Sequence, residues 1–314
     1  MLSRVADSLY WMSRYLERAE HAARVIDVHM NLMLDETSRS TGRRWSRVIE
    51  ALSVGKQPPV EEDAFRYAQD EGFERISSCI ISARENARQV REQISSEMWE
   101  QLNRLFLEVK RIGSADAWNA QPLDFLQAVK ESSHLFQGIT DSTMAHGEGW
   151  QFIQVGRFLE RAFATAKLLD VHFREFFVAT DEPGDPSDQV EWIGLLRSCT
   201  AFEAYCKVYT ADLKPERAAE FLLLNSEFPH AIRFAVDRIQ QSLECIHDIT
   251  GSKRSGSVAK LAGRLRSELS FTPLDEIRED LHGFLGKIRK QCTQIHTALH
   301  QVYITYSIEA ALEV

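Results

Sequence analysis

Apolar residues recur every three or four positions along most of this 314-residue chain. Residues at that spacing share one face of an α-helix, so the pattern predicts amphipathic helices. In the first such segment, from Leu2 to Leu34, the recurring apolar positions are Val5, Leu9, Met12, Leu16, Ala19, Ala23, Ile26 and Met30. The same pattern predicts helices over 74–112, 122–138, 147–178, 189–207, 216–249 and 273–308.

Polar segments that contain glycine, proline or both separate the predicted helices. We expect surface loops at 37–44, 53–63, 179–188 and 250–257. Pro122 and Pro273 stand near predicted helix starts, where a residue without a backbone N–H is tolerated. Because no segment alternates apolar and polar residues convincingly, the sequence predicts an all-α protein and no sheet.

One sixteen-residue pattern occurs twice. RYLERAEHAARVIDVH begins at Arg14, and RFLERAFATAKLLDVH begins 143 positions later, at Arg157. Nine of the sixteen positions are identical, and they include charged residues as well as apolar ones. Weaker matches follow at Trp45 and Trp192, each after a polar loop, and in the tripeptide PLD at 122–124 and 273–275.

The repeat predicts a duplicated helical bundle in which two related halves, 1–141 and 142–314, pack together. The alternative is a chance similarity between two amphipathic helices. Chance could readily give two helices the same spacing of apolar residues. It would less readily give them the same charged residues at matching positions. An approximate twofold axis between the halves would place the two helices that carry the repeat next to each other.

Composition narrows the class of protein. Hydrophobic residues make up 44% of the chain and charged residues 26%, as in ordinary globular proteins. A net charge of −9 argues against a broad nucleic-acid-binding face. The five cysteines form no CxxC pair and are expected to be reduced thiols. Without a signal-peptide pattern or a long apolar run, we expect a cytoplasmic protein that does not enter a membrane.

The repeat places charged side chains on one helical face in each copy. The first copy contributes Arg14, Glu17, Arg18 and His21, and the second contributes Arg157, Glu160 and Arg161. A guanidinium presents several donors in a planar fork that suits carboxylates and phosphates. Two such faces turned toward each other would form a pocket with converging acidic and basic groups. We interpret these residues as a substrate- or anion-binding site.

Two other interpretations stay open. Glu–Arg pairs three or four residues apart are common on solvated helix surfaces, where each contributes only about 0.2–0.5 kcal/mol. Alternatively, the pairs form a buried ion network that holds the two halves together. The recurrence of the same charges in both copies favours a buried or ligand-facing role over the solvated one.

An arginine stripe elsewhere is a second candidate anion site. Arg84, Arg88 and Arg91 share one face of the helix predicted over 74–112, and Glu85 and Asn86 lie beside them. A solvated face with local ion pairs is the alternative for this stripe. A weaker third copy of the charged motif is Asp237-Arg238, in which aspartate replaces glutamate.

Catalytic motifs are missing from the sequence. There is no glycine-rich phosphate-binding loop and no serine nucleophile elbow. His296 and His300 are four residues apart on a predicted helix, but no acidic residue follows at the spacing of a metal ligand. The sequence therefore identifies no catalytic residue and predicts neither a metal nor a cofactor.

The combination of motifs resembles the alpha-E domain family of bacterial helical proteins, over nearly the whole chain. The matching segments are the paired LERA motifs, the opening MLSRVADSLYWMSRYLERAEHAARVIDVH, ARENARQVREQISSEMWEQLN (83–103) and AEFLLLNSEFPHAIRFAVDRI (219–239). The third motif departs from the family pattern because it reads Asp-Arg. The resemblance implies neighbouring genes for a circularly permuted ATP-grasp protein and a transglutaminase-like cysteine peptidase. It therefore implies a system that forms or modifies peptide or amide bonds.

Two functions follow from this resemblance. In the first, the chain is a helical accessory subunit that binds the ATP-grasp ligase and presents a substrate to it, with Arg18 and Arg161 holding a carboxylate. In the second, the chain is itself an acyl or aminoacyl transferase or ligase. Its arginines would then stabilise developing negative charge, and a glutamate or His21 would act as the base. The lack of a recognisable nucleophile or cofactor motif favours the first function.

Overall fold

The computed structural model describes residues 1–32, 41–52, 64–112, 118, 120–176, 186–210, 212–251 and 255–305. All regular secondary structure within these ranges is helical, which confirms the prediction of an all-α protein. The helices are α1 (Ser3–Leu32), α2 (Thr41–Leu52), α3 (Ala64–Gln89), α4 (Ser96–Ile112), α6 (Pro122–Thr143), α7 (Glu148–Phe176), α8 (Pro186–Ser198), α9 (Phe202–Tyr209), α10 (Pro215–Leu224), α11 (Ile232–Thr250), α12 (Ser255–Phe271), α13 (Leu274–Glu279), α14 (Leu281–Leu299) and the π-helical turn η3 (His300–Ile304).

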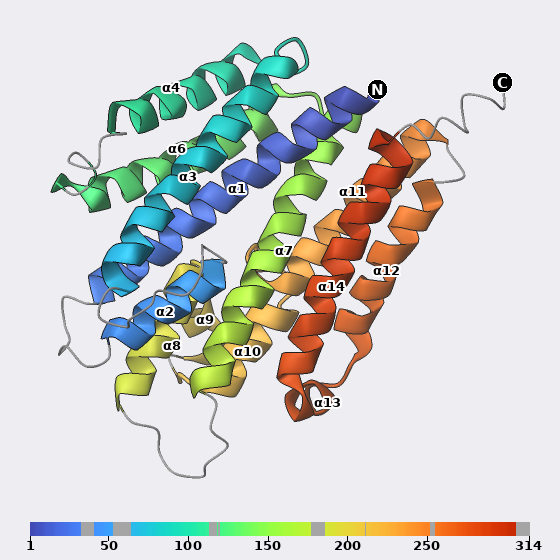
Figure 1. The fold of residues 1–314 in the computed structure, drawn as a ribbon. Coiled ribbons are helices and arrows are strands. Elements are labelled where there is room, and N and C mark those ends of the chain that lie inside the picture. Colours follow the sequence, from blue (N-terminus) through green and yellow to red (C-terminus); the bar gives the residue numbers. More distant parts are fainter. Residues whose placement is uncertain are drawn as a thin grey trace.

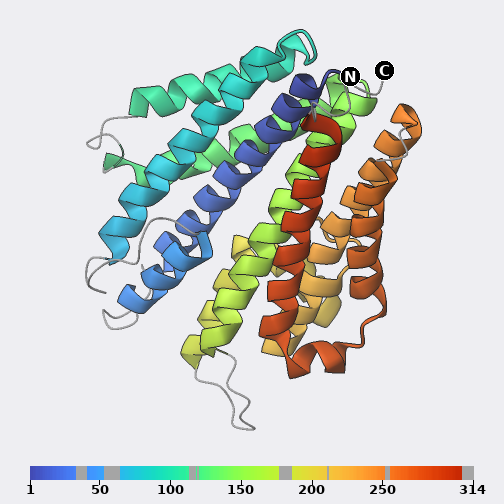
Figure 2. The same ribbon diagram turned by 45° about the vertical axis from the view of Figure 1, so that its right-hand side comes forward.

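Two long helices, α1 and α7, lie side by side at the centre of the molecule (Figure 1). They begin at the same end and run in the same direction. Helices α3, α4 and α6 lie on the α1 side, and α11, α12 and α14 lie on the α7 side, as Figure 2 also shows. The shorter helices α2, α8, α9 and α10 gather at the end where α1 and α7 finish. Both copies of the repeat therefore lie in the interior.

The contact between α1 and α7 is close because a glycine stands at the crossing. A Cβ atom at Gly156 of α7 would overlap the Ser13 hydroxyl and the Tyr10 carbonyl oxygen of α1. The apolar faces on either side of this point are fully buried, with Leu9 and Met12 on α1 and Phe152, Val155 and Leu159 on α7. The glycine thus lets the two backbones approach until these side chains interlock.

Several predicted helices are divided in the structure. Segment 74–112 forms α3 and α4, because the Ser95 hydroxyl accepts a hydrogen bond from the Met98 N–H and caps a new helix. Segment 216–249 forms α10 and α11, since the Asn225 side chain accepts from the N–H groups of Glu227 and Phe228 and turns the chain. Apolar periodicity does not show such breaks, because it continues on both sides of them.

Other boundaries were wrong. Segments 189–207 and 273–308 are also divided, into α8 and α9 and into α13, α14 and η3. Residues 41–44, 186–188 and 255–257 were predicted as loop ends, but they begin α2, α8 and α12. Helix α12 as a whole was missed, because glycine, serine and charged residues dilute the apolar face that it buries through Val258, Ala262, Leu265 and Leu269. The predicted loop at 53–63 lies outside the described residues.

The structure also bears on the expected state of the cysteines and on the expected lack of a membrane span. All five cysteines have free thiols, and those of Cys79, Cys199 and Cys292 are buried. Within the described ranges, no helix is both long enough and apolar enough to cross a lipid bilayer.

We predict that Gly156→Ala destabilises the protein by about 2 kcal/mol, because the added methyl group must push α1 and α7 apart. Thermal or urea unfolding measures the change. Gly138→Ala on the exposed face of α6 is the matched control, since a Cβ there meets nothing within 4 Å. That substitution should be neutral or slightly stabilising, because alanine favours a helix. Equal effects at both positions would show that close approach at Gly156 is not required.

Candidate functional site

The two copies of the repeat meet between α1 and α7 and exchange ion pairs. Glu17 of α1 accepts hydrogen bonds from Arg161 of α7, with Nε–Oε1 at 2.5 Å and Nη2–Oε2 at 2.9 Å. Glu160 of α7 accepts from Arg18 of α1, with Nε–Oε1 at 2.6 Å and Nη2–Oε2 at 2.9 Å. Each glutamate therefore pairs with the arginine of the other copy and not with its neighbour in sequence.

A second arginine lies near each glutamate, but only Arg14 forms a hydrogen bond with its glutamate. Arg14 donates from Nε to Glu160 Oε2 at 2.8 Å. Arg157 Nε lies 3.8 Å from Glu17 Oε2, and its Nη2 donates instead to Gln137 Oε1 at 2.6 Å. Gln137 of α6 also donates to Glu17 Oε2 at 3.3 Å. Beside Glu17, a neutral amide thus occupies space that is left open beside Glu160.

Both carboxylates are buried and ionised. Glu17 is 2% exposed and Glu160 is 5% exposed. Burial raises the pKa of each carboxyl group, but the adjacent arginines more than offset this, so both pKa values lie below the ordinary value of 4.5. A buried carboxylate that lost its arginine would keep the cost of desolvation without compensation.

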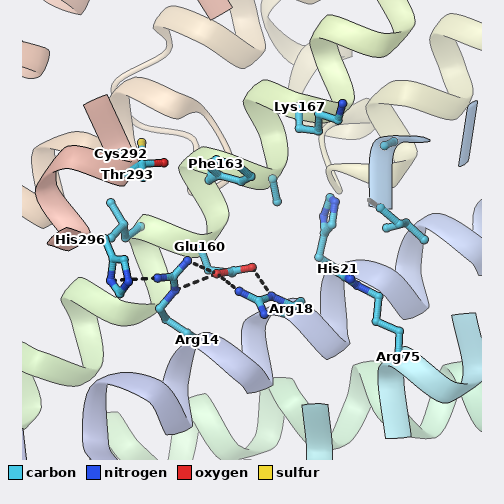
Figure 3. A pocket seen from close by; sticks show the side chains of 14 residues that line it. Arg14, Arg18, His21, Arg75, Glu160, Phe163, Lys167, Cys292, Thr293 and His296 are labelled. Atoms are coloured by element: carbon cyan, nitrogen blue, oxygen red, sulfur yellow. Dashed lines mark hydrogen bonds and ion pairs between the residues drawn. The ribbon is translucent and has the colours of Figure 1, made fainter. Parts of the chain in front are cut away.

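A cavity of about 230 Å³ opens beside Glu160 (Figure 3). Helices α1, α2, α3, α7 and α14 all contribute to its wall. Its polar lining residues are Arg14, Arg18, His21, Arg75, Glu160, Lys167, Thr293 and His296. The apolar part of the wall includes Leu52, Leu159 and Phe163. The space beside Glu17 measures only about 20 Å³.

The space beside Glu17 is filled by α6 and by the turn that precedes α11. Besides Gln137, the Pro229 carbonyl reaches the motif and accepts from Arg161 Nη1 at 3.2 Å. The Thr165 hydroxyl donates to the His230 carbonyl at 3.3 Å. The Glu17–Arg161 pair is therefore enclosed by protein, whereas the Glu160–Arg18 pair faces a cavity.

The cavity carries excess positive charge. Four cationic side chains, those of Arg14, Arg18, Arg75 and Lys167, face it together with the single carboxylate of Glu160. The histidines add none at neutral pH. Burial lowers the pKa of His21 to about 4, and burial with the nearby Arg14 lowers that of His296 to about 4. The lining therefore holds a net of three positive charges, in a chain whose overall charge is −9.

Neutral polar atoms complete the site. The His21 Nε2 atom is buried without a hydrogen-bond partner, and the side chain lines the cavity. At the other end, the Tyr10 hydroxyl lies 2.8 Å from His296 Nδ1 and accepts from Arg14 Nη1 at 3.0 Å. The arrangement can hold an anion between guanidinium groups, and it leaves the His21 imidazole available for one more hydrogen bond.

His296 and His300 pack against each other with ring centroids 4.4 Å apart. Their neighbours are the aromatic rings of Tyr10 and Trp11. In the part of the chain that the structure describes, no three His, Cys, Asp or Glu side chains are grouped as metal ligands.

The other predicted site residues lie away from this cavity. Arg84 donates to Asn103 at 3.1 Å and lies over the Phe106 ring at 4.5 Å, so it links α3 to α4. The other residues of the arginine stripe form local contacts on α3. Arg88 pairs with the exposed Glu85, and Asn86 donates to the Ser82 carbonyl. In the third motif, Asp237 accepts from Arg266, and Arg238 donates to Gln241. None of these residues lines the cavity.

Sequence reasoning missed two of the four cations. Lys167 carried a signal, because it aligns with Arg24 in the repeat and so keeps a positive charge. No sequence pattern pointed to Arg75, because it belongs to α3 and reaches the cavity only through the packing of α3 on α1.

The repeat ends in a histidine that packs on a tryptophan in each copy. The ring centroids lie 6.4 Å apart for His29 and Trp45, and 4.8 Å apart for His172 and Trp192. Burial, followed by Arg47 and Arg44, lowers the pKa of His29 to about 3. Burial also lowers the pKa of His172 well below its ordinary value. Both imidazoles are therefore neutral in the folded protein.

We predict that Arg161→Met destabilises the protein by about 3–5 kcal/mol, because it leaves the Glu17 carboxylate buried without its main partner. Urea denaturation measures the loss. Arg88→Met removes an arginine from the exposed Arg88–Glu85 pair and should have little effect. Adding Glu17→Gln to Arg161→Met should recover part of the loss, since the uncompensated charge is then gone. Equal stabilities of the Arg161 and Arg88 variants would contradict a structural role for the buried pair.

We predict that acid weakens the fold through His29 and His172. In the unfolded chain each imidazole takes up a proton near its ordinary pKa of 6.5, but the folded pKa values are lower. The stability they provide is thus complete above pH 6.5 and is lost as the pH falls toward the folded values, by up to about 1.4 kcal/mol per pH unit for each histidine.

Urea denaturation from about pH 7.5 to about pH 5 measures this slope. The double variant His29→Gln/His172→Gln keeps polar side chains that do not titrate, and its stability should depend less steeply on pH. An unchanged slope would rule out these two histidines as its source.

The family that matches this chain is described by the same Glu-Arg motif. Residues 1–304 match Alpha-E, described as "a predicted alpha-helical domain with a conserved ER motif". The chain is 21% identical to uncharacterised proteins of Mycobacterium bovis and Mycobacterium tuberculosis, over 95% of its own length but only 36% of theirs. It thus spans little more than a third of the length of these curated relatives. No solved structure matches it. Because the match covers almost the whole chain and both buried Glu-Arg motifs, the protein belongs to the Alpha-E family.

Proposed function

We propose that this protein binds a small anionic ligand in the cavity beside Glu160 and presents it to an ATP-grasp ligase as a helical accessory partner. The observation that carries the proposal is the excess of positive charge in this cavity, where four cations face one carboxylate. Cations so placed repel one another, and an anion between them relieves that repulsion. We expect a carboxylate or a phosphate, the groups that guanidinium forks bind best.

The arginines are held ready for such a ligand. Glu160 binds Arg18 through two hydrogen bonds and Arg14 through one, so both guanidinium groups are fixed before any ligand arrives. Fixed side chains lose little conformational entropy on binding, which favours affinity. The apolar wall at Leu159 and Phe163 adds room for a short hydrocarbon part. A carboxylic acid of amino-acid or dipeptide size fits this description.

The choice of partner rests on the family resemblance, which implies an ATP-grasp ligase encoded nearby. The curated relatives carry further sequence beyond the part shared with this chain. A domain that works together with another domain or protein is expected to occur in such longer chains.

The alternative, an enzyme in its own right, has less support from the cavity. Two described lining residues carry a thiol or a hydroxyl group, Cys292 and Thr293. Burial raises the pKa of the Cys292 thiol to about 12, so it stays protonated at neutral pH. The Thr293 hydroxyl donates to the Arg289 carbonyl and has no adjacent base in that contact. Neither group is activated for attack.

We also infer that the two halves, 1–141 and 142–314, arose by duplication and that their motifs have diverged in role. The reciprocal pairs Glu17–Arg161 and Glu160–Arg18 support this, as do the matched contacts of His29 with Trp45 and His172 with Trp192. In this proposal the enclosed Glu17–Arg161 pair stabilises the fold, and the Glu160–Arg18 pair beside the cavity helps to bind the ligand.

We predict that Arg75→Gln/Lys167→Gln weakens anion binding about tenfold or more, because it removes two charges from the cavity. Lys167 lies 3.6 Å from Glu50, outside the buried Glu17 and Glu160 pairs. Calorimetric titration with acetate, L-glutamate, dialanine and inorganic phosphate tests the affinity and the class of anion. Arg88→Gln/Lys290→Gln is the control, since it removes the same charges from exposed positions. Equal affinities for both variants, or no binding of any anion, would overturn the proposed site.

The partner role is tested by ADP release from the ATP-grasp ligase encoded beside this protein, with amino acids and short peptides as acceptors. We expect the wild-type protein to raise the rate or change the product, and the Arg75→Gln/Lys167→Gln variant to do neither. No effect of the wild-type protein would remove the partner role but leave the anion site standing. A product formed without the ligase would favour the enzyme alternative.

A further inference from the structure

A second cavity, of about 260 Å³, lies near the end of α7, where α10, α13 and the start of α14 surround it. Figure 1 shows α10 and α13 at this end of the molecule. The lining is apolar at Phe173, Leu223 and Ile277, which are all buried. The cavity shares no residue with the one beside Glu160 and has a different chemical character.

Two carboxylates on α10 face this cavity. Glu216, Ala219, Glu220 and Leu223 are spaced three, four and seven residues apart and together form one wall. Like charges four residues apart on a helix repel each other, which destabilises the helix by a few tenths of a kcal/mol. Glu216 and Glu220 form no ion pair with any described residue, and the Tyr209 hydroxyl that shares a hydrogen bond with Glu220 carries no charge.

The basic groups around the cavity already have carboxylate partners, one of which, Asp170, itself lines the cavity. Arg174 pairs with Glu50. Arg278 lies 3.7 Å from Asp275, and His282 Nδ1 lies 2.5 Å from Asp170 Oδ1. A cation that enters the cavity would therefore meet the negative charge of α10 directly.

We propose that this cavity binds a small amine with an apolar body, whose ammonium group lies between Glu216 and Glu220. The hydrocarbon part would fill the space between Phe173, Leu223 and Ile277, where it displaces water from apolar surface. The pairing of partly buried carboxylates with apolar walls selects such a ligand over a hydrophilic cation, which would gain nothing from the walls. This site is independent of the anion site and of the proposed partner.

The test uses phenethylammonium and its neutral isostere 2-phenylethanol, with ligand-observed NMR titration of the full-length protein. We expect phenethylammonium to bind at least about tenfold more tightly than 2-phenylethanol, because only the ion interacts with the carboxylates. Glu216→Gln/Glu220→Gln preserves the shape of the wall and should remove this preference. Glu131→Gln/Glu244→Gln, at exposed positions of α6 and α11, removes the same number of charges and should leave the preference intact.

Three results would overturn the proposal. They are no binding of phenethylammonium, equal affinity for the two probes, or an unchanged preference in Glu216→Gln/Glu220→Gln. Circular dichroism checks that this variant is folded. If it is not, Glu216→Gln alone gives the answer, since one lost carboxylate should still reduce the preference for the ion. Loss of anion binding in the Arg75→Gln/Lys167→Gln variant would not affect this result, because the two cavities share no residue.

Discussion

The structure depends on two buried carboxylates that must each meet an arginine from another helix. Glu17 and Glu160 lie where water cannot solvate them, and ionised groups in such places are tolerated only with charged, well-oriented partners. Because each partner comes from the other copy of the repeat, both ion pairs form only in one register of α1 against α7. A shift of one helical turn would break both pairs at once. The ion pairs therefore specify how the two central helices fit, and Gly156 lets them come close enough.

Once α1 and α7 are fixed, the outer helices decide what each ion pair can do. On one side, α6 supplies Gln137 and the turn before α11 supplies the Pro229 carbonyl, so the motif around Glu17 is enclosed. On the other side, α14 and α3 contribute to the wall of a cavity that opens beside Glu160. Equivalent Glu–Arg pairs are thus enclosed by protein on one side and face a cavity on the other.

The sequence predicted the central helices and the charged residues between them, but not how those residues pair. Apolar spacing predicted the long central helices, and the repeat singled out Glu17, Arg18, Glu160 and Arg161 before any contact was known. Spacing alone could not say that Glu17 pairs with Arg161, because Arg14, three residues earlier on the same helix, is equally compatible with a local pair. The breaks at Ser95 and Asn225 depend on single hydrogen bonds to side chains, which apolar periodicity does not report. Arg75 reaches the cavity from a third helix, so only the tertiary packing identifies it.

Both copies of the repeat line the positively charged cavity, but they contribute different side chains to it. Arg24 of the first copy has an acid one turn earlier, Glu20, and it also contacts His134, so its charge is compensated locally. At the matching positions of the second copy, Lys167 has Phe163 one turn earlier instead of an acid. The closest carboxylate to Lys167 is Glu50, at 3.6 Å, and that group also binds Arg174. His21 matches Ala164, and both line the cavity, so the first copy contributes an imidazole to its wall and the second contributes a methyl group. The positive charge of the cavity therefore comes from both copies and a third helix, since Arg14 and Arg18 belong to the first copy, Lys167 to the second and Arg75 to α3.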